Sequence, residues 1–494
     1  MGQLRFYSPS PERLLPHAVE WAYVAGLEAI PWRGVNSLAN GILTVERAVG
    51  ESGSLYIPWR LSARGERVLS TCTLMEREEP YCLARELARG TLYRARSLVA
   101  EMESRDRSIP TAIRDKLHEG LSALFSAAIG SSTDAQELAP RAIELASEAI
   151  EELAVLEVQA ALDDQIAADQ DVPVMLATSL RDGCVPDELT KPFMDAFHAV
   201  NISFCWRQCQ PTNGPLDWSV PREQLAWSRA HGLRAVGGPL IQLDRLSLPQ
   251  WTEGFGEGTY EQFESAATHY VRASVATFKD QVDLWVCAGR LNMPGTLAFS
   301  EEQKLRLAVA TLEAARNAAP AIPIAIGFDQ PWAEYLASEP FDLSPLHFAD
   351  ALVRADLGLA AVALEINLGY WPGGTQPRDL LAISRHLDRW SLLGIPLVVY
   401  LTLPSQSSED PQTTGPARVV PRAPDQPHLP ATGQDLAGDI IRLMLSKPAL
   451  RAVIWNQWSD KAPHEFPHSG LLDPQGAPKP LLDSLAAIRR QYLP

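Results

Sequence analysis

The sequence predicts an α/β fold in which a (β/α)8 TIM barrel follows a β-rich N-terminal module and a helical region. Two observations predict the barrel: eight short apolar runs occur after about residue 170, and amphipathic helical stretches separate them. Parallel strands that are buried on both faces read as such continuous apolar runs. An open doubly wound sheet is the rival fold, but no GxGxxG motif follows the first run, so dinucleotide binding is not supported.

The chain begins with strand-like segments. Within residues 1–80, short runs rich in β-branched and aromatic residues alternate with Gly, Asn and Ser, so we expect a small antiparallel β-module. These runs cover residues 19–27, 41–49, 54–62 and 67–74.

Residues 81–170 have a helical period instead. Apolar residues recur at spacings of three and four, and Asp134 is a candidate N-cap of the third segment. The helical segments cover residues 82–103, 111–129 and 137–166. The third segment carries an apolar stripe opposite an acidic face: Ile143, Ala146, Ile150, Leu153 and Leu156. We expect this stripe to pack on the β-module, on the barrel or on a second copy of the chain, which would make a homo-oligomer.

Composition excludes several classes of protein. With 494 residues, 46% of them hydrophobic, the chain suits two or three domains and is not expected to be disordered. Its formal charge of -17 disfavours nucleic acids and anionic membranes as partners. No stretch of 18 apolar residues occurs, and the N-terminus lacks the apolar core of a signal peptide, so we expect a cytoplasmic protein. The six cysteines form no CxxC pair or zinc pattern, and neither a metal nor a cofactor is expected.

Residues 171–494 are assigned to the barrel. The eight runs cover residues 173–179, 198–206, 234–241, 282–289, 322–329, 361–367, 395–403 and 451–458. After the seventh run, residues 404–433 contain seven prolines, and loops of this length are usually functional lids or disordered segments. Active sites of such barrels lie at the carboxyl ends of the strands, so we expect this loop beside the site.

The carboxyl ends of the runs combine aromatic, amide and charged side chains. Those that we assign to substrate binding are Trp206, Arg207, Trp285, Arg290, Asn292, Gln330, Trp332, Asn367, Tyr370, Trp371, Asn456, Gln457, Trp458 and Asp460. Such a mixture suits a saccharide ligand, since aromatic rings pack on the C–H faces of a pyranose while polar groups pair with its hydroxyls. The alternative for each Trp is core packing.

Two segments of the barrel region resemble glycoside hydrolase family 10, the endo-β-1,4-xylanase family. Residues 453–485 contain a Trp, an Asp, a Gly-Leu-Leu and a Pro-Lys-Pro before the last helix, similar to the family's closing strand and loop. Residues 197–241 resemble its second strand, the following loop and helix, and its third strand. The resemblance spans about residues 172–494 and implies a (β/α)8 barrel that hydrolyses β-linked glycans with retention.

The catalytic pair of that family does not carry over to this sequence. The family's acid lies in a Trp-Asp-x-x-Asn-Glu motif on the fourth strand. If Trp285 matches the motif Trp, Gly289 and Arg290 occupy the places of the Asn and the Glu. The family's nucleophile, in a Thr-Glu-Leu-Asp motif on the seventh strand, falls at about Thr402. An Arg is not a general acid at ordinary pH, and a Thr is a poor nucleophile without a base.

Three interpretations of other carboxylates stay open. Asp329 and Glu365 end adjacent strands and could form a displaced catalytic pair; the barrel could bind sugar without catalysis; or both carboxylates could be structural. Glu365 also resembles a residue of the nucleophile strand, but another helix and strand follow it before the last strand, so we place it on the sixth. Asp460 could contact a Lys or a substrate nitrogen, and His464 and His468 could line the cleft.

The sequence therefore predicts a carbohydrate-active, glycoside-hydrolase-like protein that acts on or recognises a β-linked glycan or oligosaccharide. The alternative is a catalytically inactive barrel that serves as a sugar-binding or scaffold protein.

Overall fold

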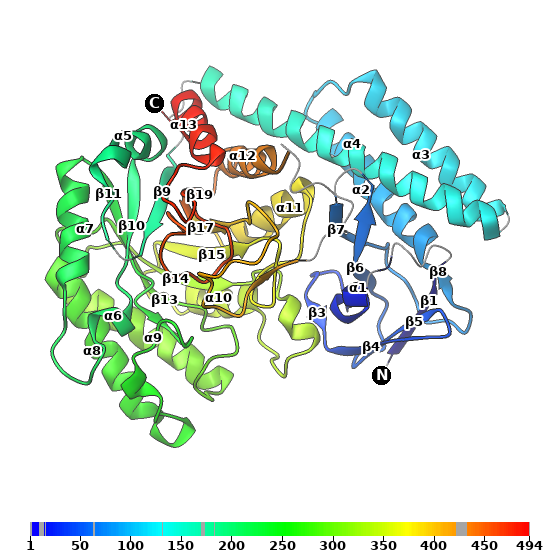
Figure 1. Cartoon of the computed structure of the whole chain (residues 1–494). Coiled ribbons are helices and arrows are strands. Elements are labelled where there is room, and N and C mark those ends of the chain that lie inside the picture. The colour runs from blue at the N-terminus through cyan, green and yellow to red at the C-terminus, as the bar shows by residue number, and fades with distance from the viewer. Residues whose placement is uncertain are drawn as a thin grey trace.

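The structure, a computed structural model, describes residues 2–8, 14, 16–62, 65–130, 132–168, 173–181, 183–420 and 432–493. Figure 1 shows the N-terminal strands and long helices on one side of the molecule and the barrel on the other.

Eight parallel strands close into a barrel (Figure 1). In chain order they are β9 (Met175–Leu180), β10 (Ala199–Ile202), β11 (Arg234–Gly237), β13 (Leu284–Gly289), β14 (Ile324–Asp329), β15 (Ala361–Asn367), β17 (Leu397–Thr402) and β19 (Leu450–Trp455). Each strand pairs with the next in this order, and β19 pairs back with β9. The predicted barrel is confirmed, with one of these strands in each apolar run. A closed sheet excludes the doubly wound alternative.

Helices cover the outside of the barrel. They are α5 (Asp187–Ala196), α7 (Ser219–Ala230), α8 (Tyr260–Phe278), α9 (Glu301–Ala318), α10 (Pro345–Arg354), α11 (Leu380–Ser391), α12 (Thr432–Leu445) and α13 (Pro480–Tyr492). Shorter elements lie near the strand ends: α6 (Trp206–Cys209), β12 (Ile241–Gln242), η2 (Gln250–Thr252), η3 (Glu257–Thr259), η4 (Glu334–Ala337), β16 (Tyr370–Trp371) and β18 (Arg418–Val419). The outward faces of the strands and the apolar faces of the helices share the largest hydrophobic core.

The inside of the barrel is apolar at one end and polar at the other. Small and branched residues, such as Val286 on β13 and Ala363 on β15, form the interior core cluster. Because side chains alternate between the two faces of a strand, residues two positions further along face the same interior. On β15 that position is Glu365, the first charged residue of the strand. The polar layer therefore lies at the carboxyl ends of the strands.

The N-terminal part contains two four-stranded sheets. One has the order β4 (Gly34–Ala39), β5 (Ile42–Arg47), β1 (Gly2–Tyr7) and β8 (Tyr81–Cys82). The other has the order β3 (Pro31–Trp32), β2 (Tyr23–Ala25), β6 (Ser54–Leu61) and β7 (Gly65–Ser70). A short helix, α1 (Pro16–Trp21), occupies the start of the segment 19–27 that the sequence predicts as a strand. That prediction is wrong for residues 19–21.

Three long helices follow: α2 (Leu83–Glu103), α3 (Thr111–Ile129) and α4 (Ser132–Ala167). Asp134 lies in the first turn of α4 and is not its N-cap. The predicted stripe packs within the chain, because Ile143 and Ala146 join the core of the N-terminal sheets. Ile150 and Leu153 pack on α2, α3 and the barrel residue Leu381. Among the described helices, none combines the length and the apolar character needed to cross a bilayer.

Buried polar contacts join the N-terminal part to the barrel. Arg378 donates to the carboxylate of Glu334 and, at 2.9 Å, to the hydroxyl of Tyr23 on β2. Arg94 of α2 donates to Asp379 at 2.7 Å, and Asp379 caps α11 by accepting from the backbone N–H of Ala382. Arg94 and Asp379, which are 285 residues apart in the sequence, therefore meet in one buried interface.

Candidate functional site

The carboxyl ends of the barrel strands meet around the guanidinium of Arg290, which directly follows β13. Glu365 on β15 accepts from Arg290 Nε, at 2.9 and 3.1 Å, and from Nη2 at 2.7 Å. Glu465, in the loop after β19, accepts from Nη1 at 2.6 Å and from Nη2 at 3.1 Å. Both edges of the guanidinium hold a carboxylate, and such bidentate, charge-assisted hydrogen bonds are among the strongest in proteins.

Two further carboxylates lie next to the same guanidinium. Asp329, the last residue of β14, places Oδ2 at 3.8 Å from Nε. Asp244, after β12, places Oδ2 at 3.8 Å from Nη1 and is the most exposed of the four carboxylates. We call Arg290 with these four carboxylates the charged centre. It holds more acidic than basic groups at the barrel mouth.

Strand register explains why Asp329 and Glu365 meet. They are partners across the parallel pair β14–β15, so their side chains leave the sheet on the same face. Asp329 Oδ1 accepts from the backbone N–H of Gln330 at 2.7 Å and from Nδ2 of Asn367 at 3.2 Å. These two donors leave Oδ2 as the oxygen next to Arg290.

Burial and neighbouring charges shift the pKa values of these carboxyl groups in different directions. Burial, together with the nearby charge of Glu365, raises the pKa of Asp329 well above the usual range of an aspartate. Burial also raises the pKa of Asp244. Burial alone would raise the pKa of Glu465, but Arg290 and Arg181 together hold it below its usual range. One carboxyl that keeps its proton beside ionised neighbours is the pattern from which acid and base roles are assigned at catalytic sites.

The backbone is left-handed where two strands enter the site. Arg290 has φ of 59° directly after β13, and Gln330 has φ of 46° directly after β14. Residues with a Cβ adopt this region rarely, and such strain is concentrated at functional sites. Both strands therefore end in a sharp turn at the charged centre.

A hydrogen-bonded layer lies on the interior strands beside the charged centre. The amide of Asn201 on β10 donates to Ser179 Oγ at 3.1 Å and accepts from the hydroxyl of Tyr400 at 3.1 Å. Ser179 also donates to Asn456 at 3.5 Å. Asn456 was predicted as a binding residue and belongs to this layer.

Three buried polar atoms at consecutive strand ends have no hydrogen-bond partner among the described residues: Gln330 Oε1, Asn367 Oδ1 and Thr402 Oγ1. Asn367 and Thr402 are partners across β15–β17, where both strands end. Buried polar atoms without a partner are rare in proteins and indicate an ordered water or a ligand. These atoms mark the part of the mouth where additional hydrogen bonds can form.

The structure places three of the predicted binding tryptophans in the core. Trp206 stacks on Tyr270, and Trp285 packs on Phe204 with none of its surface exposed. Trp458 packs edge-on against Phe193. Strand parity explains Trp285, because its neighbours Leu284 and Val286 face the barrel interior and so turn its ring toward the helices. Core packing accounts for these rings, and we do not include them in the charged centre.

The other predicted aromatics also pack on protein side chains. Trp332 stacks on His386 with ring centroids 3.9 Å apart. On β16, Tyr370 donates to the carbonyl of Pro467, whereas Trp371 contacts Trp21 of the N-terminal part with centroids 5.1 Å apart. Trp371 is the most exposed of the predicted aromatics.

The remaining predicted residues have structural partners. Asn292 clamps the backbone of Asp329, since its amide donates to the carbonyl of Asp329 and accepts from its N–H. Arg207 donates to the carbonyl of Arg245 at 2.7 Å. Gln457 donates to Asp460, which also accepts from Lys479, so the predicted contact of Asp460 with a lysine is present.

Sequence reasoning missed three charged residues of this region: Asp244, Glu465 and Arg181. Each lies in a loop or directly after a strand. None of the three lies in a segment that matches one of the family's two catalytic motifs. The position of Asp244 two residues after β12 is the one signal that the strand-end rule could have used. Glu465 stands between His464 and His468, the two residues of this loop that the sequence marks as possible cleft residues.

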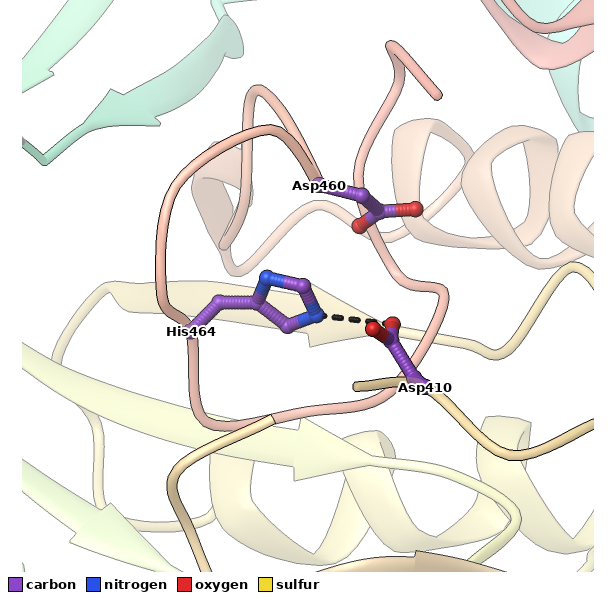
Figure 2. Close-up of side chains that lie close together, drawn as sticks. All are labelled: Asp410, Asp460 and His464. Atoms are coloured by element: carbon purple, nitrogen blue, oxygen red, sulfur yellow. Dashed lines mark hydrogen bonds and ion pairs between the residues drawn. The ribbon is translucent and has the colours of Figure 1, made fainter. Parts of the chain in front are cut away.

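One further cluster has a donor set that could hold a metal: Asp410, Asp460 and His464, whose ligand atoms all lie within 4.8 Å of one another (Figure 2). His464 Nε2 lies 2.9 Å from Asp410 Oδ2, while Nδ1 lies 2.8 Å from the carbonyl of Ala462. Lys479 and the N–H of Gly470 occupy the two oxygens of Asp460. Because protein groups already pair with these atoms, the cluster fits a structural anchor better than a metal site.

That anchor fixes the described part of the proline-rich loop. Asp410 Oδ2 also accepts from the backbone N–H of His468 at 2.9 Å, and Thr414 N–H donates to the carbonyl of His464 at 2.8 Å. Residues 404–420 are thereby held against the loop after β19. Residues 421–431 of the proline-rich loop lie outside the described residues.

The fold and the site together define a (β/α)8 barrel protein with a buried, charge-dense centre at the carboxyl ends of its strands. The sequence matches no protein-family model and no curated protein. Solved structures with a similar fold include native xylanase 10B from Thermotoga maritima, at 14% identity over 68% of this chain and 97% of that chain, with a TM-score of 0.49. Xylanase 10B from Thermotoga petrophila RKU-1 in complex with xylobiose has 13% identity over 65% and 95%, with a TM-score of 0.48. Xylanase B from Clostridium stercorarium F9 has 16% identity over 63% and 96%, with a TM-score of 0.47.

These three structures are xylanases. Similarity at this level concerns the fold, so the activity must be argued from the residues of the charged centre.

Proposed function

We propose that the protein is a glycoside-hydrolase-like barrel that recognises a β-linked glycan at the carboxyl ends of its strands without the two-carboxylate hydrolysis of family 10. The observation that carries this proposal is the engagement of Arg290 by Glu365 and Glu465. By the sequence resemblance, Arg290 stands where the family has its general acid. The surrounding carboxylates raise the pKa of Arg290 although burial opposes them, so the guanidinium keeps its protons and cannot serve as an acid.

A glycan suits the hydrogen-bonding groups that remain free. The unpaired atoms of Gln330 and Asn367 are amide oxygens, and the hydroxyl of Thr402 can both donate and accept. Saccharide hydroxyls supply both kinds of group. Asp244, with 28% of its side chain exposed, offers a carboxylate at the entrance to the centre. A site built to pair with hydroxyls discriminates strongly against ligands that lack them.

A second function is favoured by one specific observation, the raised pKa of Asp329 next to Glu365. In this alternative the protonated Asp329 donates its proton to the leaving oxygen of a glycoside, and Glu365 attacks the anomeric carbon. Glu365 would have to give up hydrogen bonds to Arg290 to do so, and we therefore rank this function second.

Binding and hydrolysis measured on the same panel of β-linked oligosaccharides distinguish the two functions. The proteins compared are the wild type, Asp329→Asn, Glu365→Gln, and Asp350→Asn as a surface control. Saturable binding by calorimetry without product in chromatography supports recognition. Turnover by the wild type and the control that both site variants lose would establish the second function instead. Absence of binding to every saccharide would contradict both.

The cytoplasmic location and the homo-oligomer formed through the helical region stay predictions. Leu156, the last residue of the stripe, remains partly exposed on α4, and Ile129 is exposed at the end of α3. Sedimentation of the full-length chain tests the oligomer, and a monomer at all concentrations would contradict it.

A further inference from the structure

A cleft of about 280 Å³ lies between the N-terminal part and the barrel. We call it the junction cleft. It is lined by residues of α1 and β2–β5, by η4 after β14, and by the segment after β15. Its volume is close to the lower end of the roughly 300–1,000 Å³ that is usual for small-molecule sites.

We propose that the junction cleft is a second saccharide-binding site, separate from the charged centre. Its walls contain three indole rings, those of Trp21, Trp32 and Trp371. Trp21 and Trp371 come from the two different parts of the molecule and contact each other at 5.1 Å. Indole rings at a cleft are suited to the C–H faces of a pyranose, which need an apolar, flat partner.

Buried polar groups in the cleft wall have unused hydrogen-bonding capacity. Gln376 is 1% exposed; its amide nitrogen Nε2 donates to the carbonyl of Trp21, while Oε1 has no partner among the described residues. Arg47 is 2% exposed, and Nε and Nη1 have no such partner, although Nη2 donates to the carbonyl of Glu51. Both residues line the cleft, and a ligand hydroxyl that paired with Gln376 Oε1 or with Arg47 Nε or Nη1 would satisfy a group that has no partner among the described residues.

Charge in the cleft favours a neutral ligand. Glu20 and Glu46 are exposed lining residues, so an anionic ligand would meet like charge. The guanidinium of Arg47 opposes a cationic ligand in the same way. Glu334 is neutralised by Arg378 and contributes no free charge. A neutral, polyhydroxylated ligand is the class that pairs with both wall groups without burying an unpaired charge.

The position of the cleft links it to the barrel mouth. The two residues of β16 face opposite ways, since Tyr370 packs on Phe466 beside the charged centre and Trp371 packs on Trp21 in the cleft. The N-terminal part therefore supplies one wall of a binding site whose other wall is a strand-end segment of the barrel.

Calorimetric titration of the full chain with xylohexaose and with cellohexaose tests this proposal. The variants are Trp371→Ala, the conservative Trp371→Phe, and Asp244→Asn in the charged centre. We expect saturable binding to the wild type, a loss of about tenfold or more in affinity in Trp371→Ala as for a central aromatic anchor, and recovery of most of it in Trp371→Phe. Asp350→Asn, on α10 and outside both sites, should leave the binding unchanged, whereas Asp244→Asn reports on the charged centre.

A second measurement does not depend on a variant. Bound saccharide should protect tryptophan fluorescence of the wild type from quenching by acrylamide. No binding and no protection with either hexasaccharide would overturn the proposal, as would wild-type affinity in a folded Trp371→Ala protein. Binding that only Asp244→Asn weakens would overturn the cleft while supporting the charged centre as the glycan site, so the two proposals can fail separately.

Discussion

Asp329 and Glu365 stand opposite each other on adjacent parallel strands, and an oxygen of each lies within 3.8 Å of the same nitrogen, Nε of Arg290. Glu365 holds the shorter contacts, at 2.7 to 3.1 Å. When two carboxyl groups share one cation, ionising one of them makes it harder to ionise the other. Here it is the pKa of Asp329 that is raised. The stability of the barrel mouth therefore depends on how charge is divided among these side chains.

Replacing Arg290 by Met should destabilise the protein strongly. The change leaves Glu365 and Glu465 buried without their counter-ion, and loss of one partner of a buried pair costs about 3–5 kcal/mol. In the double variant Arg290→Met with Glu365→Gln, the cost should be smaller than the sum of the single costs, because the amide has no charge to bury. Denaturation by urea measures all three. Additive costs would contradict the pairing.

The pH dependence of stability should report the proton of Asp329. The pKa of an unfolded aspartate is about 3.9, and the folded pKa of Asp329 is raised. The folded state thus binds this proton more tightly, so the contribution of Asp329 is fully present below the unfolded pKa and is lost as the pH rises through the folded pKa. Asp329→Asn has no such proton. The melting temperature of the wild type minus that of the variant should therefore fall with rising pH, and parallel curves would refute this.

The Arg94–Asp379 pair between α2 and α11 should be worth more than a surface pair. Both side chains are largely buried, so Arg94→Met should cost about 3–5 kcal/mol. Asp379→Asn keeps an N-cap oxygen and should cost less than Asp379→Ala, by about 1 kcal/mol. The exposed pair Arg354–Asp350 is the control, and Arg354→Ala should stay within about 0.5 kcal/mol of the wild type. Equal effects at the two arginines would show that burial does not govern the pair.

The anchor at Asp410 should control local opening of residues 404–420. Asp410→Asn weakens the hydrogen bonds to His464 and to the amide of His468. Hydrogen exchange at the amides of His468 and Thr414 should accelerate in this variant. The pKa of Asp410 is lowered because hydrogen bonds from His468, Gln412 and His464 outweigh its burial. Protection in the wild type should therefore be lost as the pH falls through that lowered pKa, while amides of β13 keep their protection.

Two glycines in neighbouring helices should respond differently to alanine. A Cβ at Gly90 in α2 would lie 2.0 Å from the carbonyl oxygen of Ser70, so the helix could not stay in its place against the chain after β7. A Cβ at Gly120 in α3 would come closest to the tip of the Leu92 side chain, at 3.3 Å, and would lie in ordinary van der Waals contact with Leu145 and the carbonyl of Ala142, at 3.6 and 3.7 Å. Thermal unfolding should show a large loss for Gly90→Ala. For Gly120→Ala, the gain in helix propensity of about 1 kcal/mol should offset the contact.

The barrel was predictable because its signal is repeated. Eight apolar runs separated by helical stretches specify a closed parallel sheet even where single boundaries are inexact. The run 234–241, for example, divides into β11 and β12. The N-terminal sheets carry a weaker signal, since β4 is exposed on most of its residues and has no apolar face to reveal it.

The candidate site was predictable only where strand parity is visible. Glu365 and Asn367 interrupt an apolar strand at alternate positions, so they had to face the same side. Trp285 lies within the buried run Leu284–Gly289 of β13, in which no polar residue marks the inner face. His386 lies on the buried face of α11 beside Trp332, and no strand parity applies to a helical residue. Asp244 and Glu465 reach the centre from loops, where no periodicity exists to place them.

The buried polar contacts between the N-terminal part and the barrel also affect how the protein unfolds. Separating the N-terminal part from the barrel would leave Arg378 paired with Glu334 but without the hydroxyl of Tyr23, and it would part Asp379 from its buried counter-ion Arg94. Such an intermediate is costly, so heat should melt both parts in one cooperative transition. A scanning calorimeter would record a single peak whose calorimetric and van't Hoff enthalpies agree.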